Sequence, residues 1–178
     1  ITAVQLEGVQ HELSTLPNVL EDVTDIVLNL KQVTFALSDA PSGWATIEAS
    51  EAGPVTAGML EGHPDLEVCN PDLVICTLTE DGPFSAKVYV DLGRGYVDRE
   101  EHEIPDEVIG VICMDANFSP VKKVAYRVQD TRVGQRTDYD KLILEITTNG
   151  AAKPEDAIGF AAKLLKDHYQ VFINFDHA

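Results

Sequence analysis

The sequence predicts an α+β protein in which a β-rich part is followed by a smaller part that ends in a long helix. Short apolar runs separated by turn residues fill positions 33–96, a pattern typical of antiparallel strands. Apolar residues recur at helical spacing in positions 21–31 and again after Pro154. Residues 1–118 hold 4 basic and 22 acidic residues, whereas residues 119–178 hold 9 and 8. This change in charge predicts a domain boundary near Ser119–Pro120.

The first expected elements are a strand and an amphipathic helix. Apolar and polar residues alternate over Ala3–Val9, which predicts a strand, and Pro17 with Asn18 predicts a turn after it. The segment EDVTDIVLNLK begins with two acids that suit a helix N-terminus and ends with Lys31, a cation that suits the opposite end. Its apolar residues share one helical face: Val23, Ile26, Val27 and Leu30.

A β-rich module is expected next. The candidate strands are VTFALS, WATIEAS, LEVCN, LVICTL and SAKVYVDL, and the segments DAPSG, EAGP, EGHPD and EDGP separate them. Residues 98–107 are acidic and predict an exposed loop. Two further strands, VIGVICMDA and VKKVAYRVQD, lead to the polar segment Thr131–Leu142, which reads TRVGQRTDYDKL and overlaps the start of a last strand, KLILEITTNG.

The final helix begins with Pro154 and two acids, as helix N-termini often do. Its apolar stripe contains Ile158, Ala161, Ala162, Leu165, Tyr169 and Phe172. Because Ile158, Leu165 and Phe172 are seven residues apart, this stripe can face either a core or a partner helix.

Composition excludes several classes of function. The formal charge of −17 opposes direct binding of nucleic acids and of anionic membranes. No run of 18 apolar residues is available to span a membrane. Three cysteines, Cys69, Cys76 and Cys113, lie in apolar runs, and their odd number argues against a disulfide framework. We therefore expect buried thiols and a reducing, cytoplasmic setting.

No pattern typical of an active site or a metal centre is present. The histidines are scattered, and the acidic pairs lie at helix starts and in polar loops, where solvation is the ordinary role. The sequence contains no phosphate-binding Walker loop and no serine in a nucleophile elbow. We expect no metal or cofactor site in this chain.

Two segments are candidate contact sites. Gly93–Tyr96, GRGY, lacks the following helix that a phosphate loop needs, and its glycines predict a tight turn that directs Arg94 outward. In Thr131–Leu142, Arg132 and Arg136 could clamp a phosphate or a carboxylate, but four nearby acids, Asp130, Asp138, Asp140 and Glu145, should largely neutralise them. A docking surface is favoured here, a structural charge network stays open, and catalysis is disfavoured because no nucleophile lies beside a base.

A series of motifs resembles the bacterial RNA polymerase alpha subunit. In order they are EGVQHELSTLPNVLEDVTDIVLNLK, GPVTAG, LGRGYV, DANFSPVKKVAYRVQDTRVGQRTDYDKLILEITTNG and PEDAI, which cover nearly the whole chain. The resemblance implies the amino-terminal, assembly-directing part of that subunit. It implies a β-rich insert subdomain over residues 1–119. Residues 120–178 would be the second half of an α/β dimerisation subdomain with a long C-terminal helix. The family has about fifty residues before the position of Ile1 and a further domain after Ala178, so we expect a fragment.

The resemblance also implies contact residues, carried over by motif position. Contacts with the β subunit would come from His11, Glu12, Ser14, Thr15, Gly93, Arg94, Gly95, Tyr96, Arg132, Gln135, Arg136 and Thr137. Contacts with the β′ subunit would come from Lys31, Met114, Val121 and Lys141. The dimer helix would use Ile158, Ala162, Leu165, Tyr169 and Phe172.

The function implied by the resemblance is a non-catalytic assembly scaffold in transcription. The expected partners are the β and β′ subunits and a second alpha subunit, with no direct contact to nucleic acid or membrane. The assembled enzyme is a nucleotidyltransferase whose catalytic residues lie on another subunit. We therefore expect no cofactor in this chain and Mg²⁺ on the catalytic subunit. The alternative is a free-standing β-rich protein-binding module, or a small-molecule enzyme with an unrecognised site.

Overall fold

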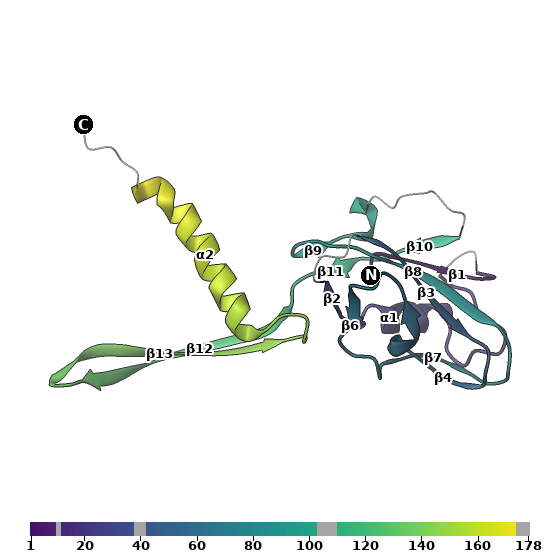
Figure 1. The fold of residues 1–178 in the computed structure, drawn as a ribbon, viewed down its shortest axis with the longest axis horizontal. Helices are drawn as coiled ribbons and strands as arrows, with labels where there is room; N and C mark the ends of the chain where they lie inside the picture. The colour runs from purple at the N-terminus through teal and green to yellow at the C-terminus, as the bar shows by residue number, and fades with distance from the viewer. Residues whose placement is uncertain (10–11, 38–41, 103–109, 174–178) are drawn as a thin grey trace. The chain divides into compact units, whose positions relative to one another are not determined.

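The computed structural model describes residues 1–9, 12–37, 42–102 and 110–173 (Figure 1). It divides the chain into two compact units, Ile1–Ser119 (unit 1) and Pro120–Ala178 (unit 2), at the position where the charge pattern changes. The mixture of strands with a long final helix confirms the predicted α+β class.

Unit 1 is built mainly from antiparallel strands. Its largest sheet has the order β10 (Val111–Cys113), β1 (Ala3–Leu6), β8 (Phe84–Val90), β3 (Gly43–Ala49) and β5 (Leu60–Glu61). Three strand pairs complete it: β2 (Phe35–Leu37) with β6 (Leu66–Val68), β4 (Gly53–Thr56) with β7 (Val74–Leu78), and β9 (Tyr96–Val97) with β11 (Ala116–Asn117). Two short 3₁₀ helices are η1 (Ala57–Met59) and η2 (Arg99–Glu101).

Helix α1 (Val23–Leu30) is the predicted amphipathic helix. Asp22 caps it, because its carboxylate accepts a hydrogen bond from the Asp25 amide at 2.9 Å. Three of the four expected face residues are buried, and Val27 is half-buried. The helix is held against β7, since the Glu21 carboxylate accepts bonds from the Thr77 amide (2.7 Å) and hydroxyl (3.0 Å). The α1 prediction is therefore confirmed.

One hydrophobic core lies inside unit 1. Its fully buried side chains come from α1 and from β1, β3, β4, β7 and β8, and include Ile26, Ile47, Ile75 and Val88. The sequence predicted most of these strands, but it missed β4, β5 and β9, which contain only two to four residues each. The prediction that all three cysteines are buried holds for Cys76 and is wrong for Cys113, which is exposed.

Unit 2 consists of a hairpin and helix α2 (Pro154–Ile173). Strands β12 (Val121–Val133) and β13 (Arg136–Thr148) each contain 13 residues and pair along nearly their whole length. The two loop residues are Gly134 and Gln135, and Gly134 has a φ of +64°. A glycine with positive φ at the first loop position suits a two-residue II′ hairpin turn. Most of the polar segment Thr131–Leu142 is therefore strand.

Unit 2 has no core of its own in the described residues 120–173. None of its side chains there is buried, although many of them are large and apolar. Alternation along the hairpin places six such residues on one face, in three cross-strand pairs: Val124 with Ile146, Tyr126 with Leu144, and Val128 with Leu142. We call these six residues the apolar ribbon face.

Candidate docking surfaces

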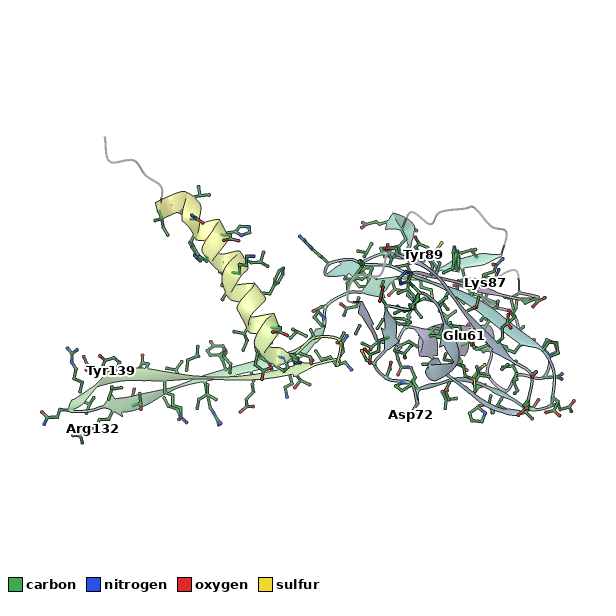
Figure 2. The ribbon with its side chains drawn as sticks, in the orientation of Figure 1. Glu61, Asp72, Lys87, Tyr89, Arg132 and Tyr139 are labelled. Carbon is green, nitrogen blue, oxygen red and sulfur yellow. The ribbon has the colours of Figure 1, made fainter. Side chains whose placement is uncertain are left out.

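The hairpin tip gathers one set of predicted β-subunit contacts. Arg132, Gln135, Arg136 and Thr137 are all exposed there, and Figure 2 shows Arg132 near the end of the ribbon. The Nε of Arg132 donates to the Gly134 carbonyl at 2.6 Å, so the turn orients this side chain. The Nε of Arg136 lies 3.8 Å from Asp138 Oδ1. Both guanidinium groups remain accessible to a partner.

The acids near the tip neutralise the arginines only in part. Arg136 faces Asp138, and farther along the ribbon Arg127 lies 3.4 Å from Glu145. By contrast, Asp130 and Asp140 are directly opposed across the two strands, and neither forms an ion pair with any described residue. Like charges in opposed positions are destabilising. Of the four acids expected to neutralise Arg132 and Arg136 largely, only Asp138 forms an ion pair with either of them among the described residues.

The Gly93–Tyr96 segment is a turn fixed by its neighbours. Gly95 has a φ of +67°, and its carbonyl accepts from the Phe118 amide at 2.8 Å. Gly93 lies against the ring of Phe118, where an added Cβ would come within 2.5 Å of the ring carbons. Gly93 thus allows close packing and Gly95 allows the positive φ, while the side chains of Arg94 and Tyr96 are exposed.

The predicted β′-subunit contacts in unit 1 are Lys31 and Met114. The Lys31 ammonium forms an ion pair with Asp115, next to Met114 in the chain. Met114 itself is 1% exposed and belongs to the core. Its burial argues against a direct contact by its side chain. The sequence signal was available, because Ile112, Met114 and Ala116 alternate with Cys113, Asp115 and Asn117 as the two faces of a strand.

The other predicted β′-subunit contacts lie in unit 2 and do not converge. Val121 is half-buried at the start of β12, opposite Thr148, whereas Lys141 is exposed opposite Gln129. Val121 and Gln129, the residue opposite Lys141, are eight positions apart on β12, a distance of about 27 Å along an antiparallel strand.

The remaining predicted contacts lie in the loop before α1. Glu12 and Thr15 are exposed and Ser14 is half-buried, while His11 lies outside the described residues. The loop is tied to the helix, because Val23 N donates to the Ser14 carbonyl at 3.2 Å and the Thr24 hydroxyl to the Glu12 carbonyl at 3.1 Å. These two hydrogen bonds fix the backbone of the predicted contact positions to the start of α1.

Helix α2 exposes more apolar surface than the sequence analysis assigned to it. The predicted dimer residues Ile158, Leu165, Tyr169 and Phe172 are exposed, and so is Ala162. A second exposed apolar stripe, which the sequence analysis missed, contains Phe160, Leu164 and Val171. At 3.6 residues per turn, the two stripes together span an arc of roughly 200° of the circumference. A helical wheel of all 20 residues of α2 shows the second stripe from the sequence alone.

The described residues offer little for small-molecule chemistry. A hollow of ≈ 460 Å³ at β1 and β8 is lined by Gln5, Leu6, Glu7, Gly8, Val9, Ser85 and Lys87 (Figure 2 labels Lys87). Within the part of the chain that the structure describes, no three His, Cys, Asp or Glu side chains group as metal ligands would. No described helix is long and apolar enough to cross a membrane.

Comparison with known proteins identifies relatives over nearly the whole chain. Residues 4–119 match the family model described as the RNA polymerase Rpb3/RpoA insert domain. Proteins named DNA-directed RNA polymerase subunit alpha are 51% identical in Nitratidesulfovibrio vulgaris, 50% in Oleidesulfovibrio alaskensis and 47% in Symbiobacterium thermophilum. Each match covers 98% of this chain and 50%, 50% and 55% of the respective relative. The chain thus spans about half the length of the curated relatives it matches.

Proposed function

Because this chain belongs to the bacterial RNA polymerase alpha-subunit family, we propose that it is a non-catalytic scaffold on which the polymerase assembles. In this proposal it dimerises with a second alpha subunit and binds the β and β′ subunits. The observation that carries the proposal is the uncovered apolar surface of unit 2, because such a surface on a stable protein marks an interaction site.

The dimer proposal rests on the width of the apolar arc of α2. A helix that packs on one surface needs an apolar stripe of about 100°. The arc of roughly 200° is wide enough for two surfaces. The apolar ribbon face can cover one stripe, and the helix of a second copy can cover the other. The stripe that we assign to the second copy contains Ile158, Ala162, Leu165, Tyr169 and Phe172.

The β-subunit contact is assigned to the exposed cations at the hairpin tip, together with the Gly93–Tyr96 turn and the loop before α1. Arginine is favoured at protein interfaces because its planar fork binds carboxylates bidentately. Lys31, Val121 and Lys141 are proposed for the β′ subunit, and Met114 would act through the core that supports its neighbours. Catalytic residues and Mg²⁺ are assigned to another subunit, with no cofactor here and no direct contact to nucleic acid. The proposed location is the cytoplasm.

Binding of the purified β subunit to the full-length alpha subunit tests this function. We expect Arg132→Ala and Arg136→Ala each to weaken binding by about 1–2 kcal/mol, which is about five- to thirtyfold. Arg127→Ala is the matched control, because it removes the same group from the middle of the same ribbon. Equal losses in all three variants would reject the tip as the contact. Absence of binding by the unaltered subunit would reject the scaffold itself, and a turnover screen would then test the enzyme alternative.

A further inference from the structure

The apolar ribbon face ends, toward the hairpin tip, in two opposed carboxylates. Asp130 and Asp140 lie on this face, because each is two positions nearer the tip than the last apolar pair, Val128 with Leu142, and the register between them is regular. As direct cross-strand partners they have Cβ atoms about 5 Å apart. We call them the carboxylate pair. Figure 2 labels Tyr139, the neighbour of Asp140, at this end of the ribbon.

The cations in the middle of the ribbon lie on its other face. Alternation directs three basic side chains there, those of Lys123, Arg127 and Lys141. Arg127 already pairs with Glu145 on that face, at 3.4 Å. The two faces therefore differ in charge. One is basic, and the other is apolar and ends in two carboxylates that form no ion pair with any described residue.

The arginines at the tip are engaged with other groups. The Arg132 Nε donates to the Gly134 carbonyl at 2.6 Å, and the Arg136 Nε lies 3.8 Å from Asp138. At the opposite end of the hairpin, Lys122 is eight positions from Asp130, which is about 27 Å along a strand. No lysine side chain spans that distance.

Helix α2 does not supply the cation either. Lys163 and Lys166 lie on its polar side, outside the apolar arc, so a helix that packs its arc on the ribbon turns both away. His168 falls within the arc, but its Nδ1 lies 2.8 Å from the Leu164 carbonyl of its own turn. Among the described residues of unit 2, none is placed to neutralise the carboxylate pair.

A single kind of partner would satisfy both features of this end of the ribbon. Opposed like charges weaken a strand pair, and Val128 and Leu142 beside them are 55% and 59% exposed. A partner that covers the apolar pair and places a cation between the carboxylates relieves both. A hydrogen bond between two charged groups is also stronger than a neutral one. Within the described part of the chain no third metal-ligating side chain joins the two acids, so a protein cation suits them better than a metal ion.

We propose that Val128, Leu142 and the carboxylate pair form a docking site for a basic segment of another polymerase subunit, one in which a lysine or arginine is flanked by apolar side chains. The inference rests on the proposed function and adds the chemistry of a partner segment to it. Charge complementarity selects this partner, because two carboxylates attract a protein cation and repel nucleic acid and anionic lipid. A second copy of this chain is less complementary, since its residues 1–118 hold 22 acids and only 4 cations.

Asp130→Lys tests the site, because it supplies the missing cation from within the ribbon. The new ammonium can pair with Asp140 across the strands, so we expect amide hydrogen exchange in the hairpin to slow about two- to tenfold. The same charge opposes the cation of a partner. We therefore expect the dissociation constant of purified β or of purified β′ from the full-length alpha subunit to rise about tenfold or more. A role limited to hairpin stability would leave binding unchanged or improve it.

Two further variants complete the experiment. The double variant Asp130→Asn with Asp140→Asn removes both charges without adding one, and we expect it to raise the same dissociation constant about three- to tenfold. Glu145→Lys is the matched control, because it makes the same change of charge on the other face of the same ribbon. Its effect on binding should stay below about threefold, although loss of the pair with Arg127 should make exchange faster.

The outcomes separate this inference from the scaffold proposal. Slower exchange in Asp130→Lys together with weaker binding of β or of β′ supports the docking site. Slower exchange with unchanged binding of both subunits overturns it, and so does an equal loss of binding in Glu145→Lys. A shift confined to the dimer constant in sedimentation equilibrium overturns it as well, because a second copy would then be the partner. If the unaltered subunit binds neither β nor β′, the proposed function itself fails and this inference fails with it.

Discussion

Replacement of Leu165 by alanine offers a quantitative test of the dimer helix. Leu165 is 60% exposed in this chain, and complete burial of a leucine side chain contributes about 1.5–3 kcal/mol. Covering the exposed part in a dimer therefore contributes roughly 1–2 kcal/mol for each copy. A twofold interface presents the residue twice, so the expected loss is roughly 2–4 kcal/mol, or about 30- to 700-fold in the dimer dissociation constant.

Sedimentation equilibrium of the full-length subunit measures that constant directly. Lys163→Ala is the control, because Lys163 lies on the polar side of the same helix and alanine favours helix at both positions. We expect less than a threefold change for this control, as is usual for an exposed position. If Leu165→Ala shifted the dimer constant no more than Lys163→Ala does, the assignment of this stripe to a second copy would be refuted.

Three further predictions concern stability and reactivity. Ile26→Ala should destabilise unit 1 by about 2–5 kcal/mol in urea unfolding, because Ile26 is fully buried in the core, and a loss below 1 kcal/mol would contradict that burial. Asp130→Asn should slow amide hydrogen exchange in the hairpin by removing the repulsion from Asp140, worth about 0.2–1 kcal/mol, and faster exchange would contradict the opposed register. In the folded protein at pH 8, a thiol reagent should modify Cys113 and spare Cys76, because burial raises the pKa of Cys76 to about 12 and thiolate forms only as pH approaches that value. Equal labelling of both would contradict this.

The sequence predicted those elements that have a pattern of apolar and capping residues within their own segment. The face of α1 is readable because a buried stripe repeats with the helical period, and Asp22 marks its start. Strand β9 was missed because its two residues become a strand only through pairing with β11, about twenty positions later. Short strands of this kind depend on tertiary contacts that no local pattern records.

For the candidate sites too, features that depend on local sequence could be predicted, and features that depend on tertiary contacts could not. The polar segment Thr131–Leu142 has almost no apolar residues to indicate a strand, yet cross-strand backbone bonds extend both strands into it. A strand whose faces are both exposed does not require alternating apolar residues. Exposure of Arg132 and Arg136 could be predicted from their surroundings. The ion pair of Lys31 with Asp115 could not, because the two residues are 84 positions apart and only the fold brings them together.

The hairpin of unit 2 leaves the outer edges of two long strands open. In the described residues β12 and β13 pair only with each other, so every second amide and carbonyl along each outer side has no strand partner. Such edges invite strand addition, and irregular pairing is a common way to restrict it. The register shifts at Val121–Lys123 and Thr131–Val133 interrupt the ladder near both ends. A third strand is therefore best accommodated along the regular middle, where main-chain hydrogen bonds would hold it whatever its side chains.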